Sequence, residues 1–163
     1  MNPELFRIID ESAGRYLTGP ERRRILDYAE SLPARLRAAE AAEAAEASAV
    51  AATLEHLRAR HAEPFFRHPD LNDRLPHDLR QILRYSALAM VCDDRTLQQD
   101  RLLTWLGSLL AGLGLSAGFR RDACAALRDK LREEMPGEAY ALLGPFLEIN
   151  IEVLGAGGPE GGP

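Results

Sequence analysis

The sequence predicts an all-α fold. Ala, Leu, Arg and Glu dominate the 163 residues, whereas the strand-favouring Val and Thr are few, and this composition favours helix almost throughout the chain. Within residues 78–92, one stripe carries apolar side chains at helical spacing. These are Leu79, Ile82, Leu83 and Met90, with small residues beside them. We therefore expect a buried central helix here, closely approached by its neighbours.

Three or four helices are predicted in the N-terminal half. The first begins at Pro3, and the Thr18–Pro20 segment ends it and starts the second. Pro33 marks a further break or kink, because proline disfavours helix at the residue before it. A long alanine-rich helical stretch then runs from Ala34 to about Ala62, and a division near Ser48 is one option.

The segment Glu63–His77 is predicted as the longest loop of the chain, because it contains Pro64, Pro69 and Pro76. Long loops in compact domains are often functional. This loop leads directly into the central helix, where Asp78 is expected in the N-terminal cap or first turn.

Three more helices are predicted after the central one, over residues 94–110, 119–135 and 138–154. In the second of these, Cys124 is expected to face inward and Arg120 outward. The count is then seven or eight helices without strands, which indicates a globin-like or bundle architecture. Residues 1–154 form one domain, and the Gly/Pro-rich tail 155–163 is expected to be disordered.

Composition and motifs exclude several classes of function. The net charge is −5 and the arginines alternate with acids, so nucleic-acid binding is not expected. Neither a signal peptide nor a run of about 20 apolar residues is visible, which predicts a soluble, cytoplasmic protein without membrane contact. Cys92 and Cys124 form no CxxC motif and are expected to be reduced thiols. No catalytic motif is present, and we expect no enzymatic activity.

A globin-like fold raises the question of haem binding, which depends on where the histidines lie. Residues 94–135 contain no histidine, although a haem globin needs its proximal ligand in that part of the fold. We therefore expect no haem. A haem-binding sensor remains an alternative, with His61 or His77 as an unusual ligand.

Charged residues gather along the start of the central helix: Arg74, His77, Asp78, Arg80 and Arg84. One interpretation is an ordinary capped helix with an exposed charged face. The other is a pocket in which the basic groups hold ligand carboxylates and Asp78 accepts hydrogen bonds from ligand N–H groups. A linear tetrapyrrole carries both kinds of group.

Three segments give the chain a resemblance to the phycobiliproteins, the allophycocyanin and phycocyanin subunits. These are GRYL at 14–17, ARLRAAEAAEAAEASAV at 34–50 and DLRQILRYSALAMVCDDRTLQQDRLL from Asp78. The resemblance covers roughly Leu5 to Leu154. It implies a globin fold with an N-terminal helical extension and a bilin ligand.

Two departures from that family pattern fall beside the site that the resemblance implies. Leu75 stands where light-harvesting members carry the cysteine that bonds the bilin, and His77 replaces an arginine that contacts a propionate. Asp78, whose counterpart hydrogen-bonds the pyrrole nitrogens, is retained. The pattern is similar to the bilin biosynthesis-associated globins of bacteria, and the Arg-, Ala- and Leu-rich composition suits such a source.

This resemblance implies a non-enzymatic protein of bilin metabolism that binds or carries a bilin without a thioether bond. Enzymes of bilin biosynthesis are then expected partners. The alternative is a ligand-free globin-fold dimer that acts as an interaction or scaffold module.

The family also pairs its subunits through the first helices, which implies a homodimer. An acid and a tyrosine near the N-terminus of one subunit meet an arginine of the other, and Glu11, Tyr16 and Arg84 fall at the matching positions. A partly desolvated acid–arginine contact would orient such a dimer. In the alternative interpretation, Arg84 caps local carbonyls or faces water.

Overall fold

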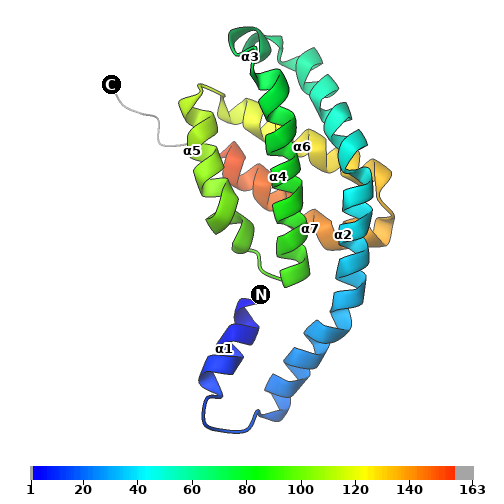
Figure 1. Ribbon diagram of the computed structural model, residues 1–163, viewed down its shortest axis with the longest axis vertical. Helices are drawn as coiled ribbons and strands as arrows, with labels where there is room; N and C mark the ends of the chain where they lie inside the picture. The colour runs from blue at the N-terminus through cyan, green and yellow to red at the C-terminus, as the bar shows by residue number, and fades with distance from the viewer. Residues whose placement is uncertain (1, 157–163) are drawn as a thin grey trace.

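The computed structural model describes residues 2–156, and within them every regular element is a helix (Figure 1). The predicted all-α class is confirmed. The elements are α1 (Pro3–Glu11), α2 (Gly19–Arg60), α3 (Ala62–Arg67), α4 (Leu71–Cys92), the π-helix η1 (Gln99–Leu103), α5 (Thr104–Gly112), α6 (Ala117–Glu134) and α7 (Gly137–Gly155).

An N-terminal hairpin of α1 and the first part of α2 extends away from the remaining helices (Figure 1). The prediction placed the end of the first helix at Thr18, but α1 already ends at Glu11. The turn that follows includes Gly14 at φ +85°, a conformation that glycine adopts without steric cost. Thr18 and Glu21 then start α2 with a reciprocal capping box.

α2 runs without interruption from Gly19 to Arg60. The helix therefore does not end at Pro33, where a break or kink was predicted, and the optional division near Ser48 is absent. Pro33 is exposed, so the carbonyl left without its helical partner can bond to water instead. Around Ser48 the alanine-rich sequence has high helix propensity and gives no reason to stop. Tertiary packing also holds this part of α2, since its alanines at positions 38, 42, 45 and 49 are buried.

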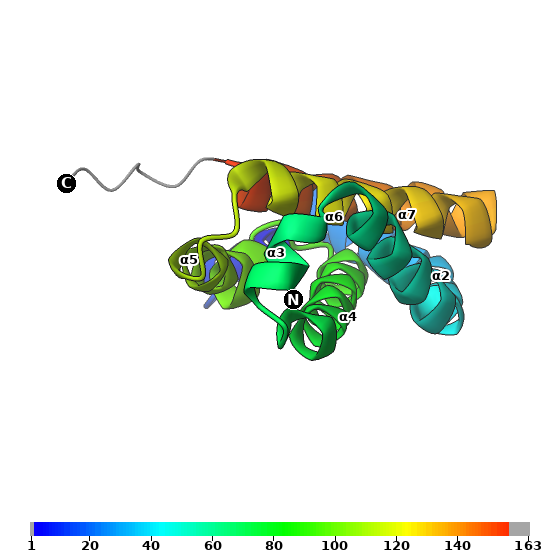
Figure 2. The same cartoon turned by 90° about the horizontal axis from the view of Figure 1, so that it is seen from above.

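The body consists of two groups of helices. Figure 2 shows α6 and α7 lying together on one side, with α4 and α5 on the other. Their facing surfaces are filled mainly by leucines, among them Leu79, Leu127 and Leu147. Burial of such side chains contributes about 1.5–3 kcal/mol each.

The central helix is confirmed, because all four predicted core residues of α4 are buried. Its start was predicted too late. α4 begins at Leu71 and contains Pro76, and α3 occupies Ala62–Arg67, so most of the predicted loop is helical. Asp78 therefore lies in the third turn of a helix and is not its cap. This position is more enclosed than a helix end.

The C-terminal third departs from prediction at three points. The segment 94–110 is divided into η1 and α5. Arg120, predicted to face outward, is buried, and its guanidinium donates to the carbonyl of Gly107 on α5 at 2.9 Å. α7 stays helical through Pro145 and includes Gly155; the rest of the predicted tail, from residue 157, lies outside the described residues.

Candidate ligand-binding groove

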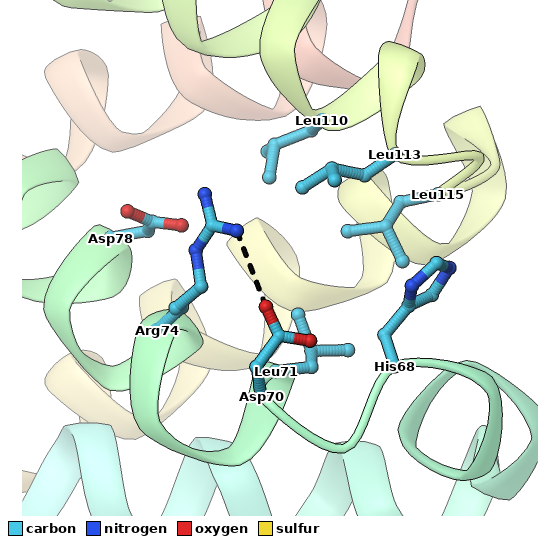
Figure 3. A pocket seen from close by; sticks show the side chains of 8 residues that line it. All are labelled: His68, Asp70, Leu71, Arg74, Asp78, Leu110, Leu113 and Leu115. Atoms are coloured by element: carbon cyan, nitrogen blue, oxygen red, sulfur yellow. Dashed lines mark hydrogen bonds and ion pairs between the residues drawn. The ribbon is translucent and has the colours of Figure 1, made fainter.

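Asp78 lies between two hollows of very different size. The smaller is shown in Figure 3 and has a volume of about 10 Å³. It is lined by His68, Asp70, Leu71, Arg74, Asp78, Leu110, Leu113 and Leu115. A cavity of this size has room for about one water molecule. It cannot admit an organic ligand without rearrangement.

The larger hollow is a groove of about 290 Å³ between α4 and the η1–α5 segment. It is lined by His77, Asp78, Gln81, Tyr85, Arg101, Leu102, Trp105 and Leu106. Its volume is near the lower end of the range for small-molecule sites, roughly 300–1,000 Å³. Trp105 is 63% exposed, so a large aromatic surface stands open at the groove.

The carboxylate of Asp78 is partly buried without a partner in the described part of the chain, and its pKa is raised. Within residues 2–156 it makes neither a hydrogen bond nor an ion pair, although the side chain is half-buried. Burial raises the pKa of Asp78 above its ordinary value of 3.8, and the positive charges of His77 and Arg74 only partly offset this. A half-buried acid without a partner costs folding free energy, and it leaves an acceptor free for a ligand.

The four residues predicted to form the site do not all come together. His77 and Asp78 line the groove, and Arg74 and Asp78 line the small cavity. The guanidinium of Arg74 lies 3.3 Å from Asp70 (Figure 3). Arg80 lines neither hollow and lies on another side of α4, with its Nε 3.8 Å from the carboxylate of Glu46.

Sequence reasoning missed the other polar and aromatic residues of the groove. Gln81 and Tyr85 follow Asp78 by one and two turns of α4, so helical periodicity alone could have found them. Arg101 and Trp105 come from η1 and α5. Only the packing of these elements against α4 brings them to Asp78, and no local signal in the sequence indicates it.

Neither cysteine of the chain is placed to form a thioether at this groove. Leu75, where the family resemblance would require a thiol, is 3% exposed and packs in the core. Cys92 lies about 25 Å beyond Leu75 along α4, at about 1.5 Å per residue. Cys124 is buried on α6, and burial raises the pKa of its thiol to about 12, which suppresses the reactive thiolate.

The histidines considered as haem ligands differ in their surroundings. His77 lines the groove and has its Nε2 3.5 Å from Gln81. The Nε2 of His61 instead lies 2.7 Å from Asp122 on α6. Binding a metal through the Nε2 of His61 would therefore first require breaking this contact.

The residues expected at a subunit interface have partners within the chain or face solvent. Arg84 holds Glu46 through two hydrogen bonds of 2.7 and 2.9 Å, and Glu11 pairs with Arg7 at 3.0 Å. Tyr16 is 96% exposed. The intersubunit contact of these residues stays a prediction.

Comparison with known protein families places most of the chain in one of them. A sequence model of the family described as phycobilisome protein matches residues 8–154 of the chain. No curated protein matches it. Among the described residues, no helix has the length and apolar character that a membrane span requires.

Proposed function

The chain belongs to the phycobilisome protein family, and we propose that it binds a linear tetrapyrrole non-covalently in the groove between α4 and η1–α5. The observation that carries this proposal is the carboxylate of Asp78, half-buried at the groove and without a partner among the described residues. Such a group favours a ligand that brings its own hydrogen-bond donors.

The pyrrole N–H groups of a bilin are donors of this kind. A hydrogen bond to a charged acceptor contributes about 1.5–3 kcal/mol, and it would lower the pKa of Asp78 because it favours the ionised form. Tyr85 and Trp105 add aromatic surface on which a planar, conjugated ligand can stack. Acceptor and aromatic surface together suit a tetrapyrrole better than a purely apolar ligand.

A ligand held without a covalent bond can exchange. With Leu75 in the core and the Cys124 thiol buried, the chain is suited to carry or sense a bilin. We therefore propose a non-enzymatic role in bilin metabolism, beside the enzymes that make or use the pigment.

Titration of the purified protein with biliverdin, followed by absorbance, tests this proposal. We expect a saturable spectral change, and we expect Asp78→Asn to weaken binding by roughly tenfold or more, the loss of one charged hydrogen bond. Asp73→Asn is the matched control, because Asp73 lies on the same helix but is exposed. A zinc-stained denaturing gel should show no pigment on the chain.

Three results would overturn the proposal of non-covalent bilin binding at Asp78. These are no spectral change, equal weakening by both variants, or a fluorescent band on the gel. A Soret band on titration with haemin that is lost in His77→Ala would instead favour the haem-binding sensor.

A second candidate function is that of a ligand-free interaction module, and the hairpin supports it. Phe6, Ile9 and Leu26 expose about half or more of their surface there, and apolar surface of this kind is typical of protein–protein contacts. We propose that a second copy of the chain covers it, with Glu11, Tyr16 and Arg84 at the interface. The dimer is compatible with either function.

Light scattering measures directly whether the chain is a monomer or a dimer in solution. Ile9→Ser should shift the chain toward the monomer, whereas Phe66→Ser, which changes an even more exposed apolar residue on α3, should not. A monomeric wild type would contradict the dimer. A dimer that is indifferent to biliverdin would favour the interaction module over the bilin carrier.

A further inference from the structure

We propose that Arg101 on η1 anchors a carboxylate of the ligand, so that the groove selects tetrapyrroles with free carboxylates over their esters. This inference rests on the proposed function and assigns a role to a residue of its site. Arg101 was not among the cations that the sequence indicated. Its position on the wall opposite α4 and its lack of an ion-pair partner carry the argument.

Arg101 is placed at the junction of two grooves. It lines the groove that contains Asp78, and it also lines a second one of about 410 Å³ beside α1. The second groove is formed by Pro3, Phe6, Asp94, Thr96, Leu97, Asp100 and Arg101. A side chain that borders both can meet an elongated ligand along its length, where a residue at one end of a single groove could not.

The arginines on α4 itself already have acidic partners. Arg74 pairs with Asp70, and both Arg80 and Arg84 lie within 4.0 Å of Glu46. Arg101 has no ion pair with any of the described residues, although Asp94 and Asp100 line the same second groove. Among the arginines discussed around Asp78, it is the one whose guanidinium is not already engaged by a carboxylate.

The two walls of the groove thus offer opposite charges. Asp78 on α4 accepts hydrogen bonds, and Arg101 on η1 donates them. A guanidinium binds a carboxylate through two parallel hydrogen bonds, which gives geometric selectivity as well as affinity. A ligand with N–H donors and carboxylate side chains can satisfy both walls at once.

The test compares biliverdin with its dimethyl ester on three proteins: the wild type, Arg101→Gln and Arg95→Gln. Arg95 is an exposed arginine six residues earlier that lines neither groove, which makes it the matched control. The wild type and Arg95→Gln should bind biliverdin roughly tenfold or more tightly than the ester. Arg101→Gln should lose this preference by weakening only the free acid, with an unchanged far-ultraviolet circular dichroism spectrum.

The two proposals fail in different ways. If Arg101→Gln keeps the preference for the free acid, or weakens acid and ester equally, the assignment of Arg101 is wrong while bilin binding stands. If the wild type binds neither compound, both proposals are wrong. Binding of the ester should still depend on Asp78. Loss of ester binding in Asp78→Asn would therefore identify the groove as the site where the ester binds.

Discussion

Asp78 on α4 and Asp122 on α6 are both partly buried, but they differ in whether other side chains contact the carboxylate. The Oδ2 atom of Asp122 lies 2.7 Å from the Nε2 of His61, 3.3 Å from the Nε of Arg60 and 3.5 Å from the Nε2 of His56. Asp78 has no such partner among the described residues. Because Asp122 has partners, it links α6 to the end of α2. Because Asp78 has none within residues 2–156, its carboxylate is available to a ligand.

The pKa shifts of the two groups follow from these surroundings. Burial acts to raise the pKa of Asp122, but the hydrogen bond with His61 and the charges of Arg60 and His56 outweigh it, so the pKa is lowered. For Asp78 burial prevails and the pKa is raised. The ionised form of Asp122 therefore stabilises the fold at neutral pH, and that of Asp78 destabilises it.

The largest effect is expected on ligand affinity as pH changes. Bound N–H donors favour ionised Asp78, so biliverdin affinity should be full above the raised pKa of the free protein. It should fall as pH drops through that pKa. With biliverdin dimethyl ester, which has no carboxylate of its own to titrate, Asp78→Asn should remove this dependence, which titrations at a series of pH values can measure. A dependence retained in Asp78→Asn would mean that another group titrates.

A smaller effect is expected on stability from Asp122→Asn. Loss of the contact with His61 should lower the free energy of unfolding by about 1–3 kcal/mol at neutral pH, measured by urea denaturation. Because the pKa of Asp122 is lowered on folding, this contribution is present above its ordinary value of 3.8. It should disappear as pH falls through the lowered pKa. Unchanged stability at neutral pH would show that the cluster does not hold α2 to α6.

The smallest effect, of opposite sign, is expected from Asp78→Asn without ligand. Removing an unpaired, half-buried charge should leave the free energy of unfolding unchanged or raise it by up to about 1 kcal/mol at neutral pH. The gain should vanish below the ordinary pKa, where the acid is neutral in both states. Marked destabilisation would mean that Asp78 has a structural partner, and the contrast with Asp122 would fail.

Much of the fold could be predicted from the sequence, because composition and periodicity act locally. The spacing of Leu79, Ile82 and Met90 fixes the buried face of α4 whatever surrounds it. The ends of the helices depended on more than local rules. Pro33 and Pro76 were predicted to interrupt or precede helices, yet the structure carries α2 and α4 through them.

The site was less predictable than the fold. Arg80 was grouped with Asp78 because the two are close in the chain, but residues two apart on a helix point about 200° away from one another. Arg101 and Trp105 reach the groove only through the packing of η1 and α5. Arg120 was misplaced for a similar reason, since its hydrogen-bond acceptor is the Gly107 carbonyl on α5.

The central claim is that the carboxylate of Asp78 is free in the unliganded protein and accepts hydrogen bonds from a bound tetrapyrrole. Carbon-13 NMR of the Asp78 carboxyl group can follow its titration with and without biliverdin. We predict a pKa above 3.8 in the free protein and a lower one in the complex. A pKa at or below 3.8 in the free protein, or one that biliverdin leaves unchanged, would contradict the claim.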